Sequence, residues 1–287
     1  MAEVERLSDP YEQIIDADLP PLKTAYYLLQ DCQRLGTLPF AHLARTAFVA
    51  TSLLRSLERI GVLTEQQRSA FQNSLNTVAR QFERDGYRVS TGEMDWDAFV
   101  ETYGHLRPGT YEITSPAYKQ NPDEYLRPIV DTGSEPADHP DPVDVWDDKT
   151  KRDIQTELNR IGLPIDVDEF IEFLVRAIEE RERSKFVFSR NLSDALEHIA
   201  AFGEEHGFSR EELSHVSLDV FFNLALDHPP SDVEQWLEEH VRDGRKKYAM
   251  TSSIELPPLL LDESDFLIFE RPTREPNFVT NDTVTAE

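Results

Sequence analysis

The sequence predicts an all-α fold, a multi-helix bundle with an irregular central loop and an extended C-terminal arm. Apolar residues recur at helical spacing along most of the chain. Capping-box pairs precede several of these stretches, and glycine or proline lies near most of their ends. We expect a helical lobe over 1–131, an acidic, proline-rich linker or loop over 132–142, a second lobe over 143–244 packed on the first, and an arm over 245–287 leading to a missing domain.

The first lobe is predicted to begin with two helices separated by a glycine. One helix covers 22–33 and ends near Gly36. The next begins at Pro39, because proline lacks the N–H that the first helical turn leaves unused, and it ends at Gly61.

Two further helices lead to the irregular loop. Thr64 and Gln67 form a capping box before a helix that closes near Gly86. The segment 87–94 is turn-like and could hold a short strand. Asp95 then caps a brief helix, which delivers the chain into the loop.

The second lobe is predicted from repeated capping patterns. Asp141 and Pro142 restart helix formation, and a helical repeat continues through the stretch 179–203. Gly244 is expected to end the last helix, after which the chain is predicted to be extended. The capping pairs are Asp166 with Glu169, Ser209 with Glu212, and Ser231 with Glu234.

The composition limits the classes of protein to which the chain can belong. It has 287 residues, a formal net charge of −26 and a single cysteine, Cys32. One cysteine excludes an internal disulfide and predicts a reducing, cytoplasmic location. The negative charge argues against nucleic acid and anionic membranes as partners. No apolar run approaches the roughly 20 residues that span a bilayer, and the lysine-poor, acidic composition suits a high-salt cytoplasm.

The stretch from Tyr103 to Pro116 is the candidate functional segment. Two glycines and two prolines within it exclude an ordinary helix or strand, and they alternate with chemically capable side chains. Loops held by a helical scaffold often carry binding groups. The structural alternative is a tight turn in which Arg107 caps carbonyls and His105 packs in the core, and the sequence leaves both interpretations open.

Templates for a self-sufficient enzyme are absent from the sequence. It has no Walker-type or dinucleotide-binding glycine loop, no cysteine pair for zinc and no Gly-x-Ser-x-Gly elbow. The eight histidines include no His-Glu-x-x-His pair. We therefore expect no cofactor and no metal site on this chain.

Four stretches together carry a family resemblance. They are Tyr103-Gly-His-Leu-Arg-Pro-Gly-Thr-Tyr-Glu-Ile-Thr-Ser-Pro116 followed by Asn121-Pro122, Gly36-Thr-Leu-Pro-Phe-Ala-His-Leu-Ala-Arg45, Lys185-Phe-Val-Phe-Ser-Arg-Asn-Leu-Ser-Asp194 and Glu275-Pro-Asn-Phe-Val-Thr280. The four stretches occur along the chain in the family's order, and they resemble the middle region of phosphoenolpyruvate-utilising enzymes, the relatives of phosphoenolpyruvate synthase and of the rifampin phosphotransferases.

The resemblance implies the central helical domain of a phosphotransferase that passes phosphate from ATP through a phosphohistidine to a small-molecule acceptor. ATP and Mg are then expected on a partner ATP-grasp domain, and the histidine on a partner swivelling domain. This chain shows neither part, since Ser253 stands where the histidine segment would need its histidine. The chain would bind the acceptor and dock the partner domains without being catalytic alone.

The same resemblance suggests roles for individual residues. Arg107 is the first candidate to face phosphate, because its guanidinium is a fixed fork of donors. His105 is the tentative catalytic base or hydrogen-bond donor, and Glu112 would orient Arg107. A structural ion pair is the competing account of these charges. The remaining candidates for the acceptor site are Tyr103, Arg45 and His42.

The alternative function belongs to a different class. The chain would be a stand-alone helical interaction or regulatory protein that has kept the scaffold without the chemistry. Such a protein is expected to expose an apolar groove for its partner.

Overall fold

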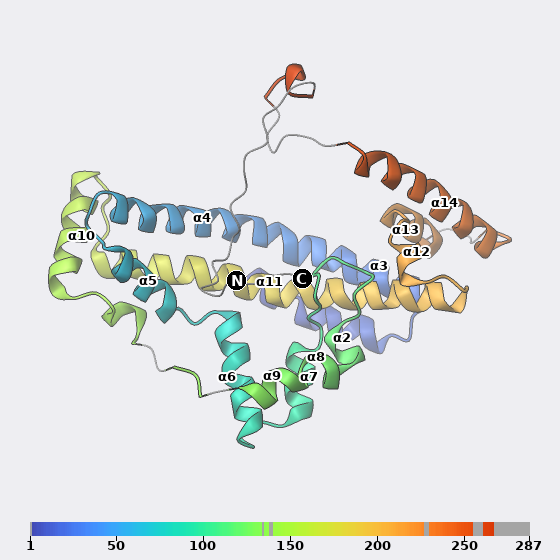
Figure 1. Ribbon diagram of the computed structural model, residues 1–287, viewed down its shortest axis with the longest axis horizontal. Coiled ribbons are helices and arrows are strands. Elements are labelled where there is room, and N and C mark those ends of the chain that lie inside the picture. Colours follow the sequence, from blue (N-terminus) through green and yellow to red (C-terminus); the bar gives the residue numbers. More distant parts are fainter. Residues whose placement is uncertain (1, 134, 138–139, 227–229, 255–260, 267–287) are drawn as a thin grey trace, which may run out of the picture.

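A single long helix organises the molecule. The computed structural model describes residues 2–133, 135–137, 140–226, 230–254 and 261–266, and within these ranges it is helical with no strand, as predicted. Helix α11 (Val167–Glu205) has 39 residues and runs almost the full width of the molecule (Figure 1), which corresponds to roughly 58 Å at the rise of an α-helix. None of the described helices is both long and apolar enough to cross a membrane.

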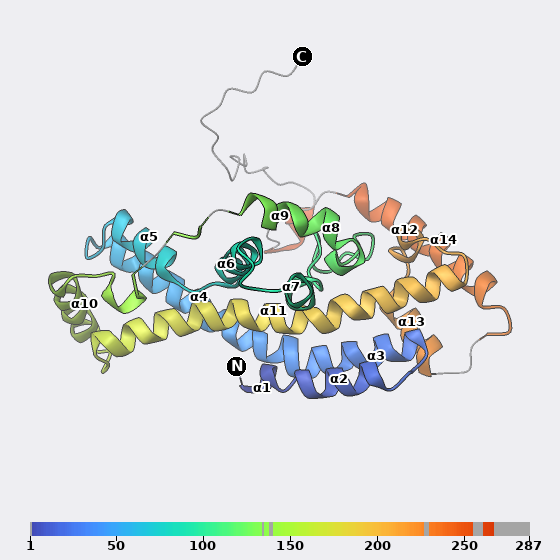
Figure 2. The ribbon, with the colours of Figure 1, turned by 90° about the horizontal axis from the view of Figure 1, so that it is seen from below.

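One side of α11 is covered by a second rod of helices, which lies along α11 and runs antiparallel to it (Figure 1). Helix α3 (Pro21–Asp31), a π-helical segment (Cys32–Thr37) and α4 (Leu38–Arg59) follow one another without a break and pack along α11 (Figures 1 and 2). The short helices α1 (Ala2–Glu5) and α2 (Ser8–Asp16) lie on the same side, with α2 against α3.

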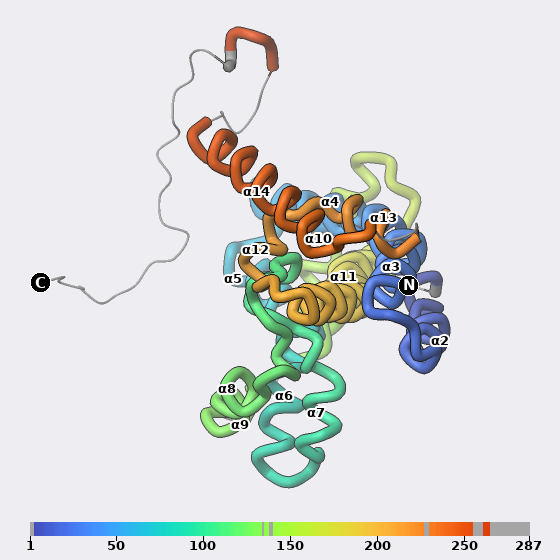
Figure 3. Tube along the Cα trace, turned by 90° about the vertical axis from the view of Figure 1, so that its right-hand side faces the viewer, coloured from blue at the N-terminus to red at the C-terminus, as the bar shows by residue number. Residues whose placement is uncertain are grey.

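The other side of α11 carries a separate lobe of short helices. Figure 3 shows this lobe projecting from the rods, and in Figure 2 it lies across α11 from α3 and α4. Its small core includes Phe99, Tyr103 and Leu126. The helices of the lobe are α6 (Val78–Ser90), α7 (Trp96–Tyr103), α8 (Pro122–Tyr125) and α9 (Arg127–Thr132).

The two ends of α11 are covered by different helices. Helices α5 (Glu65–Ser74) and α10 (Asp148–Arg160) lie at its N-terminal end, and α12 (Arg210–Leu213), α13 (Leu218–Leu226) and α14 (Val233–Ser252) lie at its C-terminal end (Figure 1). Short 3₁₀ turns occur at Tyr118–Gln120, Pro142–Asp144 and Glu263–Phe266.

Each large hydrophobic core draws on both of the predicted lobes. At the N-terminal end of α11, Leu54 and Phe71 share one buried cluster with Ile154 and Phe170. At the other end, helix α3 contributes to the same cluster as α11, α13 and α14. The predicted boundary over 132–142 therefore lies between two sequence segments that share their cores, and not between two separate cores.

The capping patterns located most helix starts correctly. Thr64, Asp166 and Ser209 each accept a hydrogen bond from the third residue of the following helix, and all three belong to complete capping boxes. Asp95 immediately precedes α7, as predicted, although its side chain makes no capping bond. The cap of α14 is Asp232, one residue after the predicted Ser231.

Gly36 and Gly244 are two of the glycines that were predicted to end helices but lie inside helical structure. At Gly36, an added Cβ would lie 2.5 Å from Cβ of Phe188 on α11. At Gly244, inside α14, it would lie 1.9 Å from the carbonyl oxygen of His215. Both glycines allow neighbouring segments to approach closely, so the predicted stops were wrong.

Several element boundaries also differ from the prediction. The helix expected to close near Gly86 is two helices, because the chain breaks after α5 and Thr77 caps α6. Helix α6 then continues to Ser90, so the segment 87–94 holds no strand. The predicted arm over 245–287 begins as the last turns of α14, and its residues 255–260 and 267–287 lie outside the described part of the chain.

Candidate functional site

The loop after α7 is fixed to the segment that follows it. The N–H of Tyr118 donates to the carbonyl of Leu106 at 2.7 Å, and the N–H of Lys119 donates to the carbonyl of Gly104 at 2.8 Å. Gly104 leaves no room for a side chain here, since an added Cβ would lie 2.8 Å from Cβ of Lys119. The loop is therefore closed at its base before any of its polar side chains are considered.

Arg107 ties this loop to the C-terminal third of α11. Its side chain is only 1% exposed. Its Nε and Nη2 donate to the hydroxyl of Ser193, and Nη2 also donates to the Ser193 carbonyl at 2.8 Å. Its Nη1 donates to the carbonyls of Glu112 and Ser115 at 3.1 and 3.0 Å. The guanidinium thus uses its donors within the fold, which argues against the prediction that it faces phosphate.

Glu197 is the charge partner of Arg107, and the sequence analysis did not single it out. Its carboxylate accepts from Arg107 at 2.9 Å, from Arg210 of α12 at 2.6 Å and from the N–H of Ala117 at 3.1 Å. Burial acts to raise the pKa of Glu197, but these hydrogen bonds and the two guanidinium charges outweigh it and lower that pKa. The available signal was an acidic residue one turn after Ser193 within a mostly buried stretch of helix.

His105 lies in the core and not at an open site. Its Nε2 is 3.1 Å from the carbonyl of Phe186, and because a carbonyl only accepts, Nε2 carries the proton. Its ring also packs edge-on against the Phe186 ring. Nδ1 is buried with no hydrogen-bond partner. Burial lowers the pKa of His105 to about 4, so the ring is neutral near pH 7 and has no access to an acceptor in this conformation.

This burial predicts that protonation of His105 opposes folding. The pKa is about 4 in the folded chain and about 6.5 in an unfolded one, so the unfolded chain binds the proton first as the pH falls. Stability should therefore drop by roughly 3 kcal/mol between pH 6.5 and pH 4 because of this residue. Urea unfolding of the wild type and of His105→Gln at several pH values measures the effect. Equal pH dependence in both proteins would contradict the assignment.

The side chains of Tyr103 and Glu112 do not lie where an acceptor site would need them. Tyr103 is buried among aromatic rings, and its hydroxyl donates to Asp85 at 2.8 Å. Burial raises the pKa of Tyr103. The carboxylate of Glu112 is exposed and accepts from the N–H of Thr114, so it is Glu112's backbone carbonyl, and not its carboxylate, that contacts Arg107.

His42 and Arg45 are not brought to the loop. Both are exposed on α4, which lies on the side of α11 opposite to the lobe that holds the loop (Figure 2). No hydrogen bond or ion pair between their side chains and other described residues is present. The six predicted residues therefore do not form one pocket.

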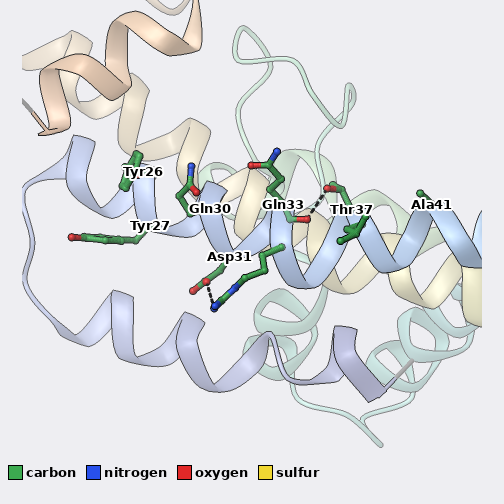
Figure 4. A pocket seen from close by; sticks show the side chains of 9 residues that line it. Tyr26, Tyr27, Gln30, Asp31, Gln33, Thr37 and Ala41 are labelled. Atoms are coloured by element: carbon green, nitrogen blue, oxygen red, sulfur yellow. Dashed lines mark hydrogen bonds and ion pairs between the residues drawn. The ribbon is translucent and has the colours of Figure 1, made fainter.

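The cavities of the described chain differ in charge. One cavity, of about 760 Å³, lies over the π-helical segment, where its charged residues Arg34 and Asp31 pair at 2.9 Å (Figure 4). A second, of about 450 Å³, contains Asp194, which accepts hydrogen bonds from Tyr11 and Lys119, each at 2.5 Å. In both cavities, basic groups are neutralised by acidic neighbours.

A smaller cavity beside the loop has unpaired cations. It has a volume of about 320 Å³ and lies between the loop, α6 and α11. Arg181 and Lys185 line it, and neither forms a hydrogen bond or ion pair with another described residue. Its lining residues are Val78, Leu106, Thr110, Arg181, Glu182, Lys185, Phe186 and Ser189.

Comparison of the chain with protein-family models, with curated proteins and with solved structures finds no match. The described residues also contain no group of three or more side chains that could hold a metal ion. The geometry described above and the sequence resemblance are therefore the basis for a functional proposal.

Proposed function

We propose that this chain is the central, acceptor-binding and docking part of a phosphotransferase of the phosphoenolpyruvate synthase type. In this role it binds a small acceptor and receives a phosphohistidine domain, and it is not catalytic alone. ATP and Mg would bind to a partner ATP-grasp domain. The family resemblance of the sequence motivates the proposal, and the way the resembling stretches pack together supports it.

The observation that carries the proposal is that three of the stretches with the family resemblance pack together. One of them, 185–194, is part of α11, and the other two pack against it. Gly36 lies against Phe188, His105 bonds to the carbonyl of Phe186, and Arg107 bonds to Ser193. The stretches 36–45, 103–116 and 185–194, far apart in sequence, thus contribute to one structural unit. The fourth stretch, 275–280, lies outside the described residues.

Within the proposal, the residues of the loop divide into two groups. Arg107, His105 and Tyr103 hold the loop in place, since their polar groups are buried or bonded within the fold. Leu106 and Thr110, from the same loop, line the cavity with unpaired cations. Arg107 would then act on the acceptor only by positioning the loop.

The test is reconstitution with the partner domains. The chain is mixed with the ATP-grasp and phosphohistidine domains encoded nearest to it, and loss of the phosphohistidine label is followed with candidate small acceptors. We expect transfer only when all three parts are present, and stable association of the chain with the phosphohistidine domain by analytical ultracentrifugation. The control is the same mixture with the heat-unfolded chain. Absence of both association and transfer would refute the proposal.

One feature favours the alternative, a helical interaction or regulatory protein. A groove of about 550 Å³ lies between the loop and α12–α14, with Leu196 and Ile199 in its apolar floor. Tyr111 and Tyr248, at 65% and 64% exposure, also line it. Such a groove suits an apolar segment of a partner. Under this alternative the reconstitution produces no transfer with any acceptor.

A further inference from the structure

We infer that the 320 Å³ cavity between the loop, α6 and α11 is a binding site for a phosphate group on a small, partly apolar molecule. The site is defined by Arg181, Lys185 and Thr110. A role of this cavity in phosphate transfer rests on the proposed function, whereas the binding of phosphate to the cavity does not.

Neither cation has a hydrogen-bond or ion-pair partner among the described residues, although only Arg181 is partly buried and Lys185 is exposed. Nε of Arg181 is buried and has no hydrogen-bond partner in the described part of the chain, although Arg181 lies on a helix rich in glutamate. Lys185 lies one turn further along the same helix and has no ion pair among the described residues. A buried guanidinium N–H without an acceptor is unfavourable. An anion in the cavity would supply that acceptor, and phosphate oxygens match the guanidinium fork.

The start of α6 adds positive potential on another side. Val78, which lines the cavity, is the first residue of this 13-residue helix, and Thr77 is its cap. The N-terminal end of a helix carries partial positive charge and unused N–H groups. The N-terminal end of α6 therefore favours a negatively charged ligand, as Arg181 and Lys185 do. This contribution comes from a different helix.

The remaining lining limits what the ligand can be. Thr110 has a hydroxyl that makes no hydrogen bond to a described residue, so it is available as a donor. The hydroxyl of Ser189 already donates to the carbonyl of Phe186 at 2.9 Å. Leu106, Phe186 and Val78 supply apolar wall. A cavity of this size suits a small molecule with one anionic group and a compact apolar body.

The overall charge makes this local arrangement distinctive. The chain carries a formal charge of −26, so an anion is repelled from most of its surface. Glu182 is the acidic residue in the lining of this cavity, against two basic ones. The nearby carboxylate of Glu179 accepts a hydrogen bond from the N–H of Asn76. The cavity thus has a net positive lining within a strongly negative molecule.

The test is a titration of the full chain with inorganic phosphate and with phenyl phosphate, followed by NMR of the Arg181 side-chain Nε–H and by calorimetry. The chloride concentration is kept constant, because salt screens the attraction between phosphate and the cations. It is set at a value at which the chain stays folded. We expect saturable binding, tighter for phenyl phosphate, with a shift of the Arg181 signal. Acetate at equal concentration measures how far a carboxylate substitutes for phosphate.

Charge-matched variants separate the site from general electrostatics. We expect Arg181→Gln to weaken phosphate binding about tenfold, and Lys185→Gln about threefold, because each removes one direct charge-assisted contact. Glu182→Gln should instead tighten binding about twofold, since it removes the opposing charge. The control Lys247→Gln has the same charge change on an exposed part of α14, and it should leave the dissociation constant unchanged.

The outcomes distinguish the site from the proposed function. Two results would overturn the site. One is that neither inorganic phosphate nor phenyl phosphate binds to the wild type at concentrations up to about 20 mM. The other is that Arg181→Gln and Lys247→Gln weaken phosphate binding equally. Arg181 makes no hydrogen bond or ion pair with another described residue, so Arg181→Gln should unfold at the wild-type urea concentration, which excludes misfolding as the cause. If phosphate binds as expected but reconstitution fails, the site stands and the proposed function falls. If transfer occurs and Arg181→Gln does not alter it, the proposed function stands and the cavity plays no part in transfer, while the phosphate titration alone decides whether the cavity binds phosphate.

Discussion

Arg107→Ala is expected to destabilise the chain by about 3–5 kcal/mol, because it removes one partner of a buried ion pair and leaves several buried acceptors unpaired. The carbonyls of Glu112, Ser115 and Ser193 would each lose a guanidinium donor. Folded proteins are stable by only about 5–15 kcal/mol, so this loss is a large share of the total. Urea unfolding followed by circular dichroism measures it.

A surface pair of the same length provides the matched control. Arg34 contacts Asp31 at 2.9 Å, the distance that also joins Arg107 to Glu197, but the Arg34 side chain is 71% exposed. Exposed pairs contribute about 0–1 kcal/mol, so Arg34→Ala should change stability little. A loss for Arg107→Ala no larger than that for Arg34→Ala would show that the buried network does not hold the loop.

Gly36→Ala is expected to destabilise the chain, by about 1–3 kcal/mol or more, because the new methyl group would lie 2.5 Å from Cβ of Phe188. Every residue except glycine has a Cβ, so no change of rotamer at Phe188 relieves this contact. The helix and α11 would have to move apart. Thermal unfolding and hydrogen exchange of the helix around Gly36 measure the loss.

The sign of this effect is the critical result. In an uncrowded helix, replacing glycine by alanine stabilises by about 0.5–1 kcal/mol. Stabilisation by Gly36→Ala would therefore mean that the glycine is a remnant of a helix end, as the sequence alone suggests. Arg34→Ala, two residues away on the exposed side of the same π-helical segment, controls for a general effect of substitution there.

The helical fold and most helix starts could be predicted because their signals are local. A capping residue and its partner lie three residues apart, so Thr64 with Gln67 and Asp166 with Glu169 are visible in the sequence. The meaning of a glycine is not local. Gly36 lies within helical structure, at a position where Phe188, 152 positions later, packs too closely for any other residue. No short window of sequence contains that information.

The sequence marked the loop as an irregular segment, but it did not predict which interactions the side chains of the loop make. Arg107 has the residue type that suits phosphate, yet its partner Glu197 is 90 positions away and shared with Arg210. Whether a cation is neutralised depends on such distant neighbours. For the same reason, the glutamate-rich sequence around Arg181 and Lys185 does not reveal that both side chains lack an ion pair among the described residues, which only the tertiary structure shows.

The long helix α11 contributes side chains to a large hydrophobic core at each of its ends, and the loop is bonded to it between them. The two cores are therefore joined by one continuous helix, so loss of packing in either core is expected to weaken the other.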